Sequence, residues 1–162
     1  EWGFDPHGLK TARMREADAA VSVLERGEVL VARSNTPALV GRAAMFPGHR
    51  QPIVASDLTI RVSAGADVSP PFLAAYLSFV YVSGHWRSQA GGASGTMKKI
   101  TRRQLRELAI PVPPLDAQKR IAELLRDRNA SSRSLQLAAV DHVGVWECLP
   151  DAQLRHAFRG EP

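Results

Sequence analysis

A run of cationic side chains without an acidic one lies between residues 83 and 106, and its chemistry suits a polyanionic partner. Residues 1–82 hold eight basic and eight acidic side chains and residues 107–162 hold seven and eight, so this run carries the whole surplus behind the net charge of +5. Lys and Arg neutralise phosphates and release their counterions. The run therefore predicts a phosphate-contact surface, with a solvated face as the alternative. Its cations are Arg87, Lys98, Lys99, Arg102, Arg103 and Arg106.

Three glycines between residues 91 and 95 predict a flexible loop inside this run, where backbone amides can approach phosphates closely. We expect Thr96, Lys98 and Lys99 to be the leading phosphate contacts. Trp86 suits either stacking on a base or a buried position, and burial is the more common outcome.

Reading a base sequence requires side chains that present donors and acceptors to base edges, such as Arg to guanine and Asn or Gln to adenine. The segments that we expect to be loops supply candidates for this task, although an ordinary surface or turn role is the alternative for each. Asn35, for example, precedes Pro37 in a Ser-Asn-Thr-Pro turn. The candidates are Arg33, Asn35, Arg42, Arg50, Gln51, Arg87 and Gln89.

Catalytic and metal-binding patterns are missing from the sequence. We find neither a Gly-x-x-x-x-Gly-Lys-Ser/Thr loop nor a Gly-x-Gly-x-x-Gly fingerprint. No adenine-methyltransferase motif and no nuclease-like set of paired carboxylates with a lysine is present either. His49 and His85 have no carboxylate or cysteine at ligand spacing, so we expect no metal site and no catalytic centre.

The elements that would position these side chains alternate between strand and helix signals, which predicts an α+β fold. β-branched runs predict strands at Val29–Arg33, Ile53–Ala55 and Leu58–Val62. Ser69 and Pro70 predict the start of a core helix that ends at Gly84.

Downstream, Thr101 and Gln104 form a capping box for a short helix near residues 102–108. Ile110–Val112 is expected to be an edge strand, since Pro111 has no amide hydrogen to donate.

A long helix is predicted from Asp116 to about Cys148, roughly 50 Å at about 1.5 Å per residue. Its apolar residues recur at 4-3 spacing, typical of a coiled-coil seam that needs a partner helix. The chain is therefore expected to comprise a mixed α/β domain over residues 1–114 and this helix, with a short final helix, over residues 115–162. The expected interface residues are Ile121, Leu125, Leu135, Ala139, Trp146 and Leu149.

The order of several motifs resembles the DNA-specificity (S) subunit of type I restriction–modification systems. One is Val29-Leu-Val-Ala-Arg-Ser-Asn35 followed by Leu39-Val-Gly-Arg42. Another is the proline-rich Ile110-Pro-Val-Pro-Pro-Leu-Asp-Ala-Gln118 with Ile121-Ala122. The last is the ending Leu154-Arg-His-Ala-Phe-Arg-Gly-Glu161.

The resemblance implies a target recognition domain that reads one half of a split DNA site, and a long helix that packs antiparallel on a second conserved helix. Methyltransferase (M) subunits would supply S-adenosylmethionine-dependent adenine methylation. A restriction (R) subunit would supply ATP- and Mg-dependent translocation and cleavage, so these cofactors belong to partners. Since one recognition domain and one helix are visible, we expect either a C-terminal fragment of an S subunit or a natural half-subunit.

Two functions remain open at this stage. The first is a non-catalytic, sequence-specific DNA-binding module, and the second is a helix-mediated dimerisation or assembly module that has lost autonomous DNA reading. No apolar run approaches the roughly 20 residues of a membrane span. Together with the single Cys148 and the absence of a signal-peptide pattern, this predicts a cytoplasmic protein without a membrane partner.

Overall fold

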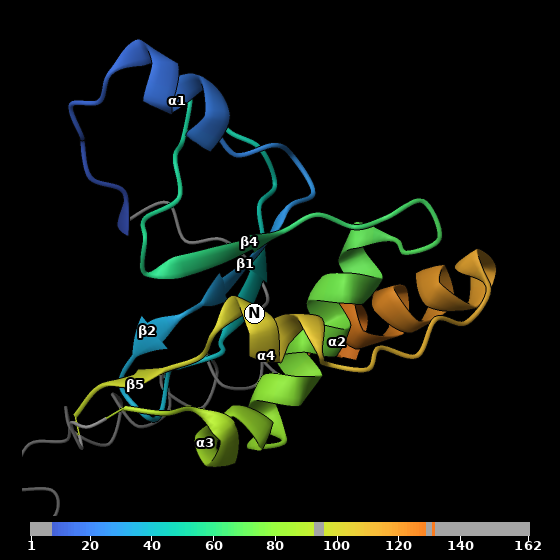
Figure 1. The fold of residues 1–162 in the computed structure, drawn as a ribbon. Helices are drawn as coiled ribbons and strands as arrows, with labels where there is room; N and C mark the ends of the chain where they lie inside the picture. The colour runs from blue at the N-terminus through green and yellow to red at the C-terminus, as the bar shows by residue number, and fades with distance from the viewer. Residues whose placement is uncertain (1–7, 93–95, 129–130, 132–162) are drawn as a thin grey trace, which may run out of the picture. The chain divides into compact units, whose positions relative to one another are not determined.

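The computed structural model of the chain describes residues 8–92, 96–128 and 131 (Figure 1). Both helices and strands are present, as the sequence predicts. Residues 8–123 belong to one compact unit, and a second unit begins at Leu124. The elements are α1 (Glu16–Ser22), β1 (Val29–Ala32), β2 (Ser34–Asn35), β3 (Ala43–Met45), β4 (Thr59–Val62), α2 (Pro70–Val82), α3 (His85–Gln89), β5 (Lys98–Lys99) and α4 (Arg102–Arg106), followed by a helix over residues 115–128.

A three-stranded antiparallel sheet of order β3-β1-β4 forms the centre of the first unit. Leu30 of β1 lies opposite Ala44 of β3 on one side and Arg61 of β4 on the other. Alternate residues of β1, Val29 and Val31, are completely buried, because successive side chains of a strand point to opposite faces. The strand predicted at Ile53–Ala55 is reduced to a single bridge between Val54 and Val23.

Helix α2 packs against this sheet, as its largely apolar sequence predicts. Pro70 occupies the first turn, where its missing amide hydrogen costs nothing. Ser69 holds the N-cap position with extended backbone, as predicted, although its hydroxyl makes no capping hydrogen bond. The residues of α2 that are buried are Phe72, Leu73, Ala74, Ala75, Leu77, Ser78 and Val80.

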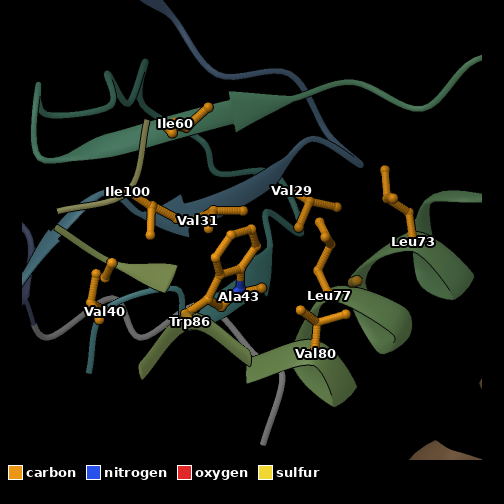
Figure 2. Packing of buried hydrophobic residues seen from close by; sticks show 12 residues of the cluster. Val29, Val31, Val40, Ala43, Ile60, Leu73, Leu77, Val80, Trp86 and Ile100 are labelled. Carbon is orange, nitrogen blue, oxygen red and sulfur yellow. The ribbon is translucent and has the colours of Figure 1, made fainter. Parts of the chain in front are cut away.

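Trp86 of α3 reaches into the core between the sheet and α2 (Figure 2). It is 1% exposed, so the stacking of this side chain on a base is ruled out in this structure. No periodic signal in the sequence marks α3, because the helix has five residues and only its tryptophan is buried. Gly41 lies beneath the indole with a φ of +80°, and a Cβ there would lie 2.0 Å from Trp86 Cδ1. Glycine is therefore the residue that allows the close approach.

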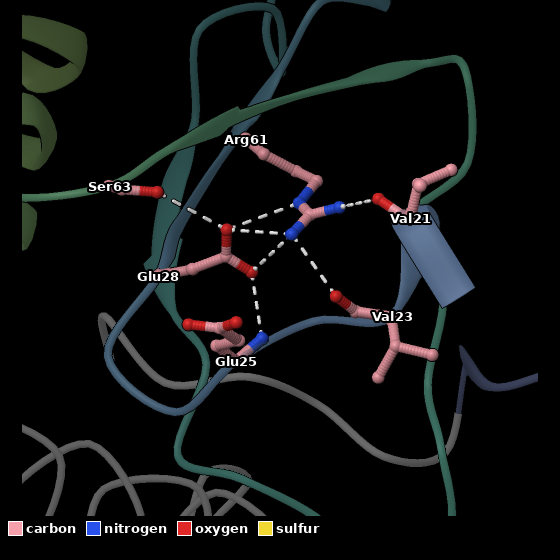
Figure 3. A network of polar contacts seen from close by, with 6 residues as sticks. All are labelled: Val21, Val23, Glu25, Glu28, Arg61 and Ser63. Carbon is pink, nitrogen blue, oxygen red and sulfur yellow. Dashed lines mark hydrogen bonds and ion pairs between the residues drawn. The ribbon is translucent and has the colours of Figure 1, made fainter. Parts of the chain in front are cut away.

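A polar network ties β1 and β4 to the segment after α1 (Figure 3). The buried carboxylate of Glu28 accepts hydrogen bonds from Arg61 Nη2 at 2.8 and 3.0 Å, from the Glu25 backbone N–H at 2.8 Å, and from the Ser63 hydroxyl. Arg61 also donates to the carbonyl of Val23. Burial pushes the pKa of Glu28 upward, but the Glu25 amide, the Arg61 guanidinium and the Ser63 hydroxyl together hold that pKa below its ordinary value.

Gln118 fastens the start of the 115–128 helix to the start of α2. Its completely buried side chain donates to the carbonyls of Asp67 and Pro113 at 2.7 and 2.8 Å and accepts from the Ser69 backbone N–H at 2.8 Å. Both N–H donors of the amide and one lone pair of its oxygen are therefore used in hydrogen bonds that join the two helices to the proline-rich segment.

The edge strand expected at Ile110–Val112 is wrong, because residues 107–114 form no strand. Ile110 instead packs against the core as a partly buried side chain. The Tyr76 hydroxyl donates a hydrogen bond to the Ala109 carbonyl at 3.0 Å. With prolines at 111, 113 and 114, this segment has few amides to offer a ladder.

The described helix covers the first part of the long helix predicted from Asp116 to Cys148. The rest of that prediction, with Leu135, Ala139, Trp146, Leu149 and the final short helix, lies outside the described residues. Within the described part of the chain, no helix is long and apolar enough to cross a bilayer.

Candidate nucleic-acid interface

The β2–β5 ribbon brings together side chains that are far apart in the sequence (Figure 1). Ser34 lies opposite Lys99, and Asn35 lies opposite Lys98. The turn predicted at Ser34–Pro37 is therefore partly wrong, since its first two residues are strand and the turn begins at Thr36, whose carbonyl accepts from the Leu39 N–H at 3.0 Å. The partner strand that pulls Ser34 and Asn35 into the ribbon lies more than 60 residues downstream, beyond the reach of a local turn signal.

Backbone hydrogen bonds fix the ribbon to its surroundings on both edges. On the outer edge of β2, the Ser34 N–H donates to the Leu58 carbonyl at 3.3 Å. The Ile100 N–H donates to the Arg33 carbonyl at 2.9 Å, which continues the pairing of the two strands by one residue. Lys99 and Gly91 exchange two backbone hydrogen bonds of 2.8 and 3.0 Å, so Gly91 is paired rather than part of a free loop as predicted. Ile100, which follows β5, is completely buried and anchors that strand in the core.

Helix α4 starts directly after the ribbon, and its predicted capping box is confirmed. The Thr101 hydroxyl accepts from the Gln104 N–H at 3.1 Å, and Gln104 Oε1 accepts from the Thr101 N–H at 2.8 Å. This cap fixes the first residue of α4, the helix that carries the exposed Arg102, Arg103 and Arg106. Such a box satisfies two orphan amides at the helix start and is worth on the order of 1 kcal/mol.

Gln104 also links α4 to α3. Its Nε2 donates to the Gln89 carbonyl at 2.8 Å, so α3 with Arg87 and Gln89 is held beside α4. The sequence pattern predicts only the capping role of Gln104. The hydrogen bond from Gln104 to Gln89 spans 15 residues, and no local pattern predicts it.

Arg103 differs from the other cations of α4 because it forms an ion pair. Its Nε lies 2.7 Å from Glu107 Oε1, with the two side chains 86% and 60% exposed. The i,i+4 spacing of Arg103 and Glu107 is a sequence signal for this pair, and Glu107 is the first residue after the acid-free run. An exposed pair of this kind is weak, so it lowers the availability of Arg103 without removing its charge from the surface.

A groove of about 990 Å³ runs beside β4 and α4. Four arginines line it, together with one carboxylate, Asp57. Arg61 is neutralised by Glu28, whereas the other three form no ion pair with any described residue. The groove thus carries a net positive rim continuous with the ribbon. Its arginines are Arg33, Arg61, Arg102 and Arg106.

The structure groups some of the predicted site residues and separates others. Arg33, Asn35, Lys98, Lys99 and Arg102 lie on or next to the ribbon, and Arg87 and Gln89 are joined to it through α3. Thr96 is exposed shortly before β5.

Three candidates lie on other segments of the chain. Arg42 lies on the β3 side of β1, where its carbonyl accepts from the Ala32 N–H at 2.8 Å. Arg50 and Gln51 lie in the segment between β3 and β4, where the Gln51 N–H donates to His49 Nδ1 at 3.1 Å. No hydrogen bond or ion pair among the described residues connects these three to the ribbon.

Comparison with known families identifies the type of domain. Residues 23–134 match the family described as the type I restriction modification DNA specificity domain, which covers more than half of the chain. The chain therefore belongs to this family, as its motifs suggested. The domain of this family is a DNA-recognition module rather than a catalytic one. No curated protein matches the chain significantly.

Proposed function

We propose that this chain is a sequence-specific DNA-binding specificity module of a type I restriction–modification system, which reads one half of a bipartite site and docks methyltransferase subunits. The observation that carries the proposal is the convergence of Arg33, Asn35, Lys98, Lys99 and Arg102 on one ribbon and the helix after it. Family membership supplies the DNA partner. S-adenosylmethionine, ATP and Mg would act on the methyltransferase and restriction subunits.

Electrostatics supports the same assignment. Among the described residues near the ribbon, Glu107 and Asp57 are the acids that face these cations, and Glu107 is occupied by Arg103. Duplex DNA carries one negative charge per about 1.7 Å of its axis, so a surface with several unpaired cations on rigid elements suits it. We assign phosphate contacts to Thr96, Lys98, Lys99, Arg102 and Arg103, with Arg87 and Gln89 as candidates for reading base edges.

The test is duplex binding by fluorescence anisotropy across a range of salt concentrations. We expect wild-type affinity to fall steeply with salt, and the double variant Lys98→Ala/Lys99→Ala to bind more weakly with a slope shallower by at least about 1, about one unit per lost phosphate contact. The matched control is Lys10→Ala/Arg13→Ala, which removes the same charge from exposed positions far from the ribbon in sequence. Equal losses in both double variants would show that net charge, not this surface, governs binding.

A second candidate, the helix-mediated assembly module, is favoured by a different observation. Ile121, which the heptad spacing assigns to the interface, is 38% exposed on the 115–128 helix. An exposed isoleucine at a seam position suits a partner helix. Salt-insensitive self-association without duplex binding would favour this function over DNA reading.

A further inference from the structure

The two lysines of β5 have different surroundings although they are adjacent in the sequence. Lys98 lies opposite Asn35 and Lys99 opposite Ser34. Directly opposed residues of an antiparallel pair share a face, and successive residues alternate faces. Lys98 therefore shares a face with Asn35, while Lys99 projects from the other face of the ribbon.

The side chain of Asn35 is already oriented. Its Oδ1 accepts a hydrogen bond from the Thr36 backbone N–H at 2.8 Å, and only the oxygen of the amide can do so. This contact fixes which end of the amide carries the amine. The Nδ2 donor makes no hydrogen bond to any described residue, and the oxygen keeps a second lone pair. One donor and one acceptor side by side match the N7 and N6 groups of adenine in the major groove.

Lys98 supplies the complementary chemistry. Its ammonium carries three donors and no acceptor, which suits the O6 and N7 acceptors of guanine. Opposed Cβ atoms in such a ribbon lie about 5 Å apart, and base pairs stack at about 3.4 Å. Asn35 and Lys98 can therefore reach the same base pair or adjacent ones. The major groove of B-DNA is wide enough to admit a two-stranded ribbon.

Lys99 suits a different task. It is exposed, and its backbone is held by the two hydrogen bonds to Gly91 on the edge away from β2. When the Asn35 face of the ribbon points at base edges, a side chain on the opposite face is directed away from them, and the long, flexible side chain of Lys99 has only the flanking phosphates of the duplex to contact.

We propose that the Asn35–Lys98 face of the β2–β5 ribbon reads base edges, an adenine and a guanine on the same or neighbouring base pairs, and that Lys99 holds phosphate. This inference rests on the proposed DNA-binding function and divides its contacts into two classes. It assigns Lys98 to specificity, whereas the sequence alone suggests a phosphate contact for both lysines.

The experiment is selection from a randomised duplex library with the full chain, followed by affinity measurements on the selected sequence and its single-base variants. We expect Lys98→Ala to reduce discrimination at one or two base positions by about 5- to 150-fold, the range of one lost base contact. We expect Lys99→Ala to weaken binding to all sequences equally, to reduce the salt slope by about 1, and to leave the order of preferred bases unchanged.

Asn35→Asp is the variant that separates reading from a local turn role. The aspartate keeps an oxygen for the Thr36 N–H, loses the amine donor and adds a negative charge, which weakens binding to all sequences rather than at one base position. Relaxed discrimination at the adenine position in this variant supports the inference, whereas unchanged base preferences assign Asn35 to the turn and overturn it. Identical effects of Lys98→Ala and Lys99→Ala also overturn it. A wild-type base preference that survives both Asn35→Asp and Lys98→Ala would overturn this inference alone, whereas binding without base preference, or no duplex binding, would overturn the proposed function as well.

Discussion

At the scale of single residues, Glu28 shows how one buried acid serves the fold. Its carboxylate receives a guanidinium, a backbone amide and a hydroxyl, and its pKa is lowered although burial acts in the opposite direction. A carboxylate in such a setting stabilises the folded structure only while it is ionised. The network therefore makes stability depend on pH.

The pH dependence has a definite sign. Because the folded-state pKa of Glu28 lies below its ordinary value of 4.5, the stabilisation is complete above that value and is lost as pH falls through the folded-state pKa. We expect Glu28→Gln to lower the free energy of unfolding at pH 7 by about 2 kcal/mol. The difference from wild type should shrink below pH 4.5.

Urea denaturation at several pH values measures this difference. Glu25→Gln is the matched control, because Glu25 is an exposed acid in the same segment and contributes only its backbone N–H to the network. A constant difference between wild type and Glu28→Gln from pH 7 to pH 3 would contradict the assignment of the ionised form.

At the scale of elements, Gln118 is the joint between the proline-rich segment and two helices. We expect Gln118→Ala to lower the free energy of unfolding by about 3 kcal/mol, because it leaves the Ser69 N–H and the carbonyls of Asp67 and Pro113 without their partner. The midpoint of thermal or urea unfolding measures the loss. Lys119→Ala, an exposed neighbour on the same helix, should change stability by less than about 0.5 kcal/mol.

The elements also show where sequence reasoning succeeds and where it stops. The core helix, the capping box of α4 and the strand at Val29 depend on local signals, and the structure confirms them. The pairing of Ser34–Asn35 with Lys98–Lys99 and the second contact of Gln104 depend on long-range packing, which no local pattern encodes. The strand predicted at Ile110–Val112 fails because Ile110 packs on the core without a neighbouring strand, while Val112 is exposed.

The same distinction applies to the candidate site. Charge counting locates the cationic surface, since charge is a property of the sequence. It cannot show that Lys98 lies opposite Asn35 and Lys99 opposite Ser34, because strand register depends on long-range pairing. The roles of Arg42, Arg50 and Gln51 stay predictions.

At the scale of the whole molecule, the two candidate functions make different demands on the chain. If the 115–128 helix provides an assembly surface, Ile121→Asp should reduce the mass of the species seen by sedimentation or light scattering, because a buried carboxylate at a seam is costly. Arg120→Asp, a charge change at the exposed neighbouring position, should leave that mass unchanged. A wild-type protein that is monomeric at all accessible concentrations would contradict self-association and leave docking to another subunit as the role of this face.

The ribbon is attached to the rest of the domain through its peptide groups, from Ser34 to Leu58 and between Lys99 and Gly91. Peptide hydrogen bonds form equally well whatever side chain the residue carries, apart from proline. Ser34 is buried, but the side chains at positions 35, 98 and 99 can be exchanged while the strands stay in register. Diversification of these three positions should yield a set of folded proteins with altered binding preferences, so the ribbon is a natural starting point for a combinatorial library on an unchanged scaffold.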